Sequence, residues 1–189
     1  LSEGVETAVL PIALCAEEAE VREGITMCAK PLFRAEELAE ASPRLVEDWV
    51  NYHALIGVDH VQMYDTDGTL EPWLSRSSGF ASGVGMTYLP RFFELISDEM
   101  QKVAEAGFRE CVETLALDHC LFSNVHRTRW LLMLHAPDAY VHSPGLRPSL
   151  TADMQNLEAE ALATEEGPLC AVSLRENWLG GLPEHGEEG

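Results

Sequence analysis

Two apolar segments with a helical pattern between them constrain the fold of this chain most strongly. Residues 25–29 (ITMCA) are apolar and are followed by Lys30 and a proline, which is typical of a buried strand. Residues 58–64 (VDHVQMY) have the length of a second strand and lead into the turn sequence at 65–68 (DTDG). A strand, a helix and a strand in succession predict two parallel strands joined by a crossover.

The segment between these strands has the pattern of an amphipathic helix over residues 43–56. Its apolar side chains recur every three or four residues, at Leu45, Trp49, Tyr52 and Ile56. Ser42 is expected to cap the start of this helix, with Pro43 at the first helical position, and Gly57 is expected to end it. His53 lies on the apolar face, so we expect a core histidine with a hydrogen-bond partner.

The rest of the chain continues to alternate between helix and strand patterns. The expected elements are a helical turn at 69–74, a strand at 84–89, a helix at 97–122 that Gly107 weakens, a strand at 130–135, a helix at 151–163 and a strand at 169–174. This alternation predicts an α/β fold, with a mostly parallel sheet flanked by helices. We expect residues 25–178 to form one α/β domain, between an N-terminal segment (1–24) of unassigned structure and an acidic, glycine-rich tail (179–189).

Acidic residues dominate the charge of the chain. Its 189 residues include 32 Asp and Glu but only 12 Lys and Arg, which gives a formal net charge of −20. Nucleic-acid binding needs clustered cations, so we expect no nucleic-acid partner.

The five cysteines match no disulfide framework or zinc motif, although a single disulfide remains compatible with the sequence. The longest apolar stretch, residues 8–16, is too short to span a membrane.

Candidate binding residues follow the first two expected strands. Ligands of open α/β sheets bind beyond the carboxyl ends of the strands, where Lys30, Asp65 and Asp67 are expected to lie. The two carboxylates can accept hydrogen bonds from a nucleobase or ribose, or bind a hard cation. The alternative is an ordinary surface turn. Lys30, Arg127 and Arg129 are candidate contacts for an anionic group, with exposed surface residues as the alternative.

A second candidate site follows the expected strand at 130–135. His135 and Asp138 flank an alanine and a proline, and imidazole and carboxylate groups together suit a divalent metal such as manganese. The alternative is a structural loop. The histidines at 119, 126, 135 and 142 fit no zinc motif, and His119 beside Cys120 is expected to be a packing or capping residue rather than a ligand.

Two blocks of this sequence together resemble glycosyltransferase family 92. The first is residues 46–68 (VEDWVNYHALIGVDHVQMYDTDG), which is similar to the family segment that links the first two strands of a GT-A fold. The second runs from His119 to Val141 and is similar to the family's cysteine, tryptophan and metal-motif segment. In that second block His135 replaces the first acidic residue, Pro137 is inserted, and Ala139 replaces a glutamate, so only Asp138 keeps a carboxylate.

The resemblance implies a GT-A-like fold and a glycosyltransferase of the hexosyltransferase class. Such an enzyme transfers a sugar from a UDP-sugar donor to a glycan acceptor, with inversion of configuration at the transferred sugar. The resemblance implies galactose as this sugar. It implies Mn²⁺ at His135 and Asp138, and donor contacts from Lys30, Asp65, Asp67 and Arg127. The catalytic base has no assignable position. The family setting implies the secretory pathway or Golgi lumen, with any membrane anchor in a segment outside this chain.

Two other functions compete with this interpretation. The altered metal motif favours a module that keeps the GT-A fold and binds a nucleotide without transfer chemistry. The aspartate turn and the histidine-rich segment are also compatible with an unrelated α/β metal-dependent hydrolase.

Overall fold

The computed structural model of the chain describes residues 24–33, 35–74, 80, 83–105, 109–134, 137, 139–143, 149–163 and 171–172. Its centre is a sheet of four strands in the order β3-β2-β1-β4, all parallel. The strands are β1 (Ile25–Ala29), β2 (His60–Tyr64), β3 (Gly85–Leu89) and β4 (Trp130–Leu134). The parallel pairing of β1 with β2 and the α/β fold class are confirmed.

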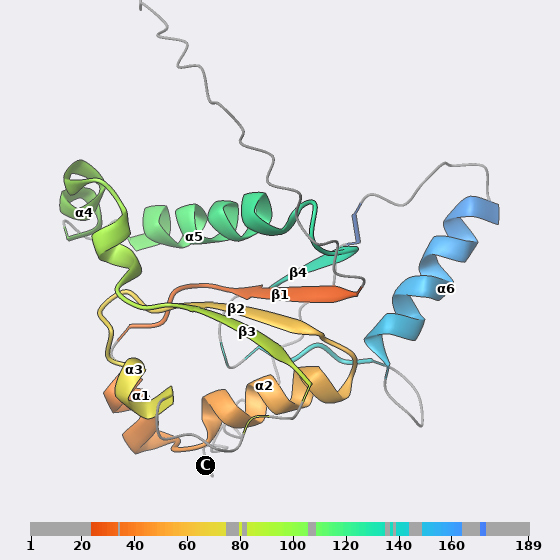
Figure 1. The fold of residues 1–189 in the computed structure, drawn as a ribbon, viewed down its shortest axis with the longest axis horizontal. Coiled ribbons are helices and arrows are strands. Elements are labelled where there is room, and N and C mark those ends of the chain that lie inside the picture. Colours follow the sequence, from red (N-terminus) through yellow and green to blue (C-terminus); the bar gives the residue numbers. More distant parts are fainter. Residues whose placement is uncertain are drawn as a thin grey trace, which may run out of the picture. The chain divides into compact units, whose positions relative to one another are not determined.

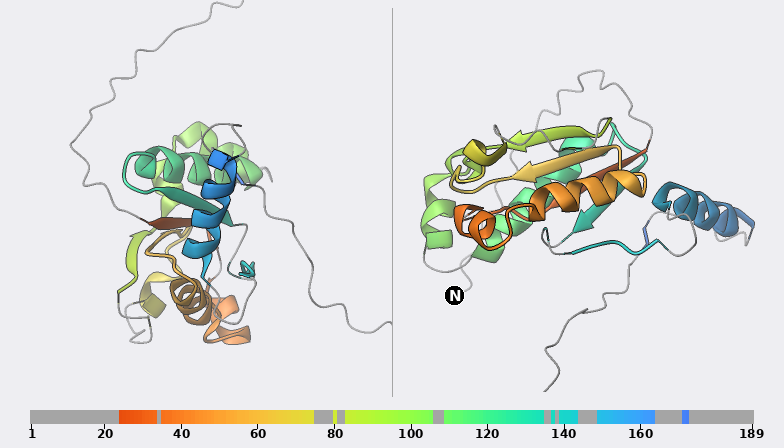
Figure 2. Two further views of the ribbon diagram at one scale, coloured as in Figure 1. Left: turned by 90° about the vertical axis from the view of Figure 1, so that its right-hand side faces the viewer. Right: turned by 90° about the horizontal axis from the view of Figure 1, so that it is seen from below.

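Helices cover both faces of this sheet, as Figure 1 shows with α5 on one face and α2 on the other. Helix α2 is Leu45–Leu55 and α5 is Arg109–Asn124. The view from below in Figure 2 shows α2 lying along the strands. The other helical elements are α1 (Ala35–Ala41), α3 (Glu71–Leu74), a 3₁₀ turn (Phe92–Leu95), α4 (Asp98–Glu105) and α6 (Leu150–Ala163).

Strands β1 and β2 are buried along their whole length, because both lie inside the sheet between helical layers. The α5 side of the sheet holds a core cluster of six buried residues, namely Cys28, Tyr64, Phe92, Val112, Ala116 and Cys120. Cys28 on β1 and Cys120 on α5 form a disulfide across 92 residues of sequence. This bridge resolves the question that the cysteine spacing leaves open.

The start of α2 differs from the expectation drawn from Ser42 and Pro43, which was wrong. Helix α1 precedes α2. The turn between them continues the hydrogen bonding of α1, because the Ser42 N–H donates to the Leu38 carbonyl. The Leu45 N–H then donates to the Ser42 carbonyl, so the helix begins at Leu45, two residues after Pro43. The pattern of an N-cap followed by proline therefore occurs here in an interhelical turn.

The end of α2 is as expected. Gly57 has a φ of +108°, and its N–H donates to the Ala54 carbonyl, so it ends the helix in a conformation that side chains disfavour. A Cβ at this position would lie 2.5 Å from the Thr151 hydroxyl oxygen, so the close approach also requires glycine.

His53 is the core histidine that the helical pattern predicts. It is fully buried, and its Nδ1 lies 2.8 Å from the Trp49 carbonyl oxygen, so Nδ1 carries the proton. The Val141 N–H donates to Nε2 at 3.4 Å. Burial lowers the pKa of His53 below its usual value, which keeps the ring neutral.

The chain after β4 runs beside α2. The Trp49 indole N–H donates to the Ala139 carbonyl at 2.8 Å, and the Tyr52 hydroxyl donates to the Val141 carbonyl at 2.7 Å. With the Val141 contact to His53, these bonds fix residues 139–141 against the helix.

The expected strands at 84–89 and 130–135 and the expected helix at 151–163 are confirmed as β3, β4 and α6. The region 97–122 contains two helices, α4 and α5, separated by residues outside the described ranges. The expected strand at 169–174 also lies outside them, except for residues 171 and 172, which are in no strand.

The chain divides into two compact units, Leu1–Thr151 and Ala152–Gly189, and the sheet belongs entirely to the first. Among the described residues, no helix is both long enough and apolar enough to traverse a lipid bilayer.

Candidate functional site at the carboxyl edge of the sheet

The carboxyl ends of the four strands lie along one edge of the sheet. Ala29 pairs with Leu134 and Tyr64 pairs with Leu89, so β1 ends level with β4 and β2 ends level with β3. Cys28 pairs with Gln62, so β2 extends one residue beyond the end of β1. Leu32 forms one further bridge with Asp65. Lys30, Asp65 and Asp67 therefore lie at this edge, as the sequence predicts.

Asp65 is a fully buried carboxylate that organises the turn after β2. Its Oδ1 accepts the N–H groups of Asp67 at 3.2 Å and Gly68 at 3.0 Å. Its Oδ2 accepts the Leu70 N–H at 2.8 Å and the Tyr88 hydroxyl at 2.6 Å. Four hydrogen bonds occupy both oxygens, so the carboxylate holds the turn from inside the protein.

Tyr88 on β3 is the side chain that completes the shell around Asp65. Burial raises the pKa of the Tyr88 phenol, and the hydrogen bond and negative charge of Asp65 raise it further. The phenol therefore stays protonated and remains a donor to Asp65. This contact joins the carboxyl ends of β2 and β3, and nothing in the sequence pattern predicted it.

Asp67 differs from Asp65 because it is exposed at the surface of the turn. Its Oδ1 accepts the hydroxyl of Thr69 at 2.7 Å and the Thr69 N–H at 3.2 Å. The two aspartates of the turn thus have different roles in the structure. One is enclosed by the chain, and the other presents a carboxylate at the edge.

Arg91 is a cation at this edge that the sequence analysis missed. It follows β3 after Pro90, in a left-handed conformation with a φ of 51°, and its Nη1 lies 3.7 Å from Glu94 Oε1. A Cβ on Gly68 would lie 3.0 Å from Arg91 Cγ. The absence of a side chain at Gly68 therefore allows the aliphatic part of Arg91 to pack against the aspartate turn. The signal available in the sequence was a basic residue shortly after an expected strand.

Lys30 lies at the same edge, after β1. Its ammonium group lies 2.7 Å from Glu113 Oε2 on α5, and both side chains are about three-quarters buried, with 23% and 29% of their surface exposed. Among the sequence-predicted residues, Lys30, Asp65 and Asp67 are therefore brought to one edge.

Arg127 is not part of that group. It precedes β4, and the neighbouring Thr128 hydroxyl donates to the Gly24 carbonyl at the start of β1. Arg127 thus lies at the amino edge of the sheet. It is separated from Lys30 by the length of a five-residue strand, which is about 15 Å.

His135 and Asp138, the expected metal ligands, lie outside the described residues. Strand β4, which precedes them, ends at the carboxyl edge.

A polar network lies between β2 and α5, where the sequence analysis expected only packing around His119. The Tyr64 hydroxyl lies 2.8 Å from His119 Nδ1, and the Gln62 amide donates to the Tyr64 oxygen. Asn124 in turn donates to the Gln62 carbonyl oxygen at 2.7 Å. Burial raises the pKa of Tyr64 to about 12 and lowers that of His119.

This network fixes the orientation of α5 over the end of β2, because each buried polar group needs its partner. His119 contacts the rings of Tyr64 and Phe92 edge-on, as expected of a packing residue, and it also takes part in the hydrogen-bond network. The signal in the sequence was the alternation of His60, Gln62 and Tyr64 along a strand that is buried on both faces.

No family model, curated protein or solved structure matches this chain. The α/β assignment with a parallel sheet therefore rests on the structure itself.

Proposed function

We propose that this chain is a GT-A-type glycosyltransferase that binds a UDP-sugar at the carboxyl edge of its sheet. The observation that carries the proposal is the aspartate turn, Asp65–Gly68, at the end of a central parallel strand between the ends of β1 and β3. Open α/β sheets bind ligands at this edge. The sequence resemblance to glycosyltransferase family 92 supports the same activity, namely inverting transfer of a sugar, with galactose as the donor sugar, to a glycan acceptor.

In this proposal the two aspartates of the turn act differently. Asp67, exposed at the edge, accepts hydrogen bonds from the ribose or uracil of the donor. Asp65 is a positioning residue, because its oxygens already hold the backbone of the turn and the Tyr88 hydroxyl.

The diphosphate would interact with the cations of this edge. Arg91 offers an exposed guanidinium beside Gly68, and a guanidinium can bind phosphate oxygens in a bidentate manner. Lys30 is paired with Glu113, so phosphate binding to Lys30 requires an exchange of partners. Arg127 lies at the other edge and is left out of the donor site.

The proposed metal depends on His135 and Asp138, which follow β4. Within the described part of the chain, no three His, Cys, Asp or Glu side chains are grouped so as to hold a metal ion. A bound Mn²⁺ would stabilise the negative charge that develops on the leaving diphosphate. The chain's own contribution is to hold the nucleotide through Asp67 and Arg91, in a turn that Asp65 keeps rigid.

The Cys28–Cys120 disulfide supports the secretory-pathway setting that the resemblance implies. Disulfides form and persist in oxidising compartments and are rare in the reducing cytosol.

Calorimetric titration with UDP, with and without MnCl₂, tests this proposal. We expect Mn²⁺-dependent UDP binding that Asp67→Asn and Arg91→Ala each weaken about tenfold, since each removes one charged hydrogen bond. Arg127→Ala is the matched control, because it removes a guanidinium from the opposite edge and should leave UDP affinity unchanged. Hydrolysis of a panel of UDP-sugars with Mn²⁺ then reports turnover. No UDP binding with any metal would overturn the proposal.

A nucleotide-binding module without transfer activity is the second candidate. It is favoured by the four internal hydrogen bonds of Asp65, which leave one carboxylate of the turn to face a ligand, and by His135 and Ala139 in place of acidic residues. This candidate predicts UDP binding that Mn²⁺ does not change and no hydrolysis of any donor. The same titration and hydrolysis panel therefore separate the two functions.

A further inference from the structure

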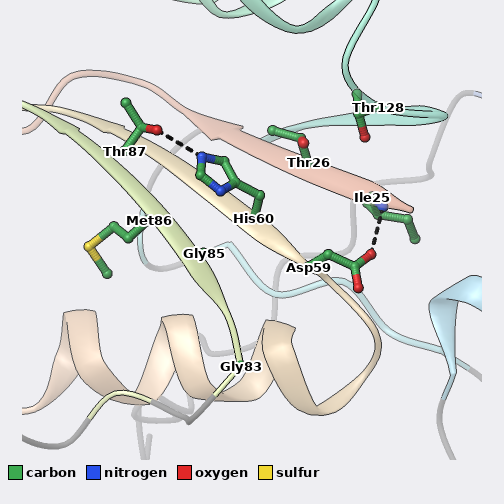
Figure 3. A pocket seen from close by; sticks show the side chains of 9 residues that line it. All are labelled: Ile25, Thr26, Asp59, His60, Gly83, Gly85, Met86, Thr87 and Thr128. Carbon is green, nitrogen blue, oxygen red and sulfur yellow. Dashed lines mark hydrogen bonds between the residues drawn. The ribbon is translucent and has the colours of Figure 1, made fainter. Parts of the chain in front are cut away.

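We propose that a cavity at the amino edge of the sheet binds a small uncharged polyol, independently of the site proposed at the carboxyl edge. The cavity has a volume of about 450 Å³ and lies where β1, β2 and β3 begin. Figure 3 shows its polar side chains, which come from these three strands and from Thr128 before β4. A cavity of this size holds a single sugar ring.

Three polar side chains form the floor of the cavity. Thr26 pairs with His60 in the sheet register, and His60 Nε2 lies 2.8 Å from the Thr87 hydroxyl oxygen. Figure 3 shows the three side chains on the same side of the sheet. Thr26 is 1% exposed and His60 is 6% exposed, so both are nearly enclosed.

The Thr26 hydroxyl is the group that most clearly points to a ligand. It lines the cavity, and among the described residues no hydrogen bond to its side chain is found. Since no buried side-chain oxygen or nitrogen of these residues lacks a partner, the hydroxyl is open to the cavity. A ligand hydroxyl, which both donates and accepts, can form a hydrogen bond with this group.

Asp59 supplies a carboxylate, the only one among the described residues that line the cavity. Its Oδ2 accepts the Ile25 N–H at 2.9 Å, and its other oxygen points away from Ile25 in Figure 3. Among the described residues that line the cavity there is no Lys or Arg, so this part of the lining carries a single negative charge. Arg127 and Arg129 belong to the same edge but are not lining residues. This balance disfavours phosphate esters and favours ligands that donate hydroxyl hydrogens to a carboxylate.

Two glycines keep these polar groups in position. A Cβ on Gly85 would lie 2.5 Å from His60 Nδ1, and a Cβ on Gly24 would lie 1.9 Å from Asp59 Oδ2. Gly24 also has a φ of +126°, which other residues rarely adopt. The imidazole and the carboxylate can occupy their observed places only because both neighbours lack side chains.

Protein-observed NMR titration with galactose, glucose and myo-inositol tests this inference. We expect saturable shifts of the Thr26, His60 and Thr87 amides for at least one of these probes, with a dissociation constant in the millimolar range. Thr26→Val and Thr87→Val keep the side-chain shape and should each weaken binding about tenfold, since each removes one hydroxyl contact. Gly85→Ala should weaken binding as well, by displacing the His60 ring.

The control variant is Asp67→Asn, which belongs to the carboxyl edge and should leave polyol binding unchanged. Its effect on UDP binding is measured separately, so failure of one site does not imply failure of the other. Glucose 6-phosphate is the competing probe. The inference is wrong if none of the three polyols gives saturable shifts, if both valine variants bind like the unmodified chain, or if only the phosphate ester binds, with shifts at Arg127 and Arg129.

Discussion

Asp65 shows how one side chain can determine the geometry of a whole edge. Its carboxylate is enclosed by three backbone N–H groups and the Tyr88 hydroxyl, and it connects the ends of β2 and β3 to Leu70, the residue before α3. Hydrogen bonds to charged groups contribute more to stability than neutral ones. The aspartate turn is therefore held firmly from inside the protein, and its outer carboxylate, on Asp67, lies at the surface.

Tyr88→Phe should lower the free energy of unfolding by about 2 kcal/mol, because it removes a hydrogen bond to a buried carboxylate. Tyr52→Phe is the matched control. It removes a hydroxyl that donates to a neutral carbonyl, and it should cost about 1 kcal/mol. Urea unfolding of both variants measures the difference. Equal losses would mean that the Asp65 contact has no special strength.

Unfolding free energy should decrease as the pH falls below the usual histidine pKa of about 6.5. Burial lowers the pKa of His53 in the folded chain, so between that lowered pKa and about 6.5 the unfolded chain binds more protons. The contribution of neutral His53 is fully present above pH 6.5 and is lost as the pH falls toward the folded pKa.

Urea midpoints at pH 7.5, 6.5 and 5.5 measure this dependence. His119 has a lowered pKa for the same reason and adds a contribution of the same sign. His53→Gln should therefore flatten the pH dependence more than His119→Gln does, since His53 is fully buried and His119 is partly exposed. An unchanged slope in both variants would show that other groups control the acid response.

At the scale of elements, α5 is attached to the sheet by two kinds of contact. The disulfide joins it to β1, and the Tyr64, Gln62 and Asn124 hydrogen bonds join it to β2. The bridge closes a sequence separation of 92 residues, and a loop of that length lowers the entropy of the unfolded chain substantially. Helix α5 therefore depends on an oxidising environment for its full stability.

Replacement of both Cys28 and Cys120 by alanine should lower the free energy of unfolding by about 4–5 kcal/mol, from the loop-closure entropy alone. For a chain of this size that corresponds to a fall in Tm of about 10–15 °C. Reduction of the unmodified chain with dithiothreitol should lower Tm by a similar amount, because it opens the same bridge. The expectation fails if reduced and oxidised protein unfold at the same temperature.

At the scale of the whole molecule, the formal charge of −20 opposes compaction. Raising the ionic strength from about 10 mM to about 150 mM shortens the Debye length from about 30 Å to about 8 Å and screens the repulsion among carboxylates. We expect Tm to rise by about 2–4 °C, equivalent to about 1 kcal/mol. Thermal scans in sodium chloride measure this. A fall in Tm would mean that ion pairs such as Lys30–Glu113 outweigh the repulsion.

Local sequence patterns were sufficient to predict most of the sheet. The apolar segments that form β1 and β2, the helical spacing of α2, and the glycine at 57 each act over a few residues, so their conformation follows from neighbours in sequence. The same patterns placed Lys30, Asp65 and Asp67 at one edge, because parallel strands bring their carboxyl ends together. The α1–α2 turn was missed, since its sequence also suits a helix start.

Only the tertiary structure decided which polar groups face inward and which outward. Asp65 and Asp67 look alike in sequence, but Tyr88 from another strand encloses one of them. The pairing of Cys28 with Cys120 and of Gln62 with Asn124 likewise joins residues 92 and 62 positions apart. Such contacts depend on how strands and helices stack, and no local pattern records that stacking.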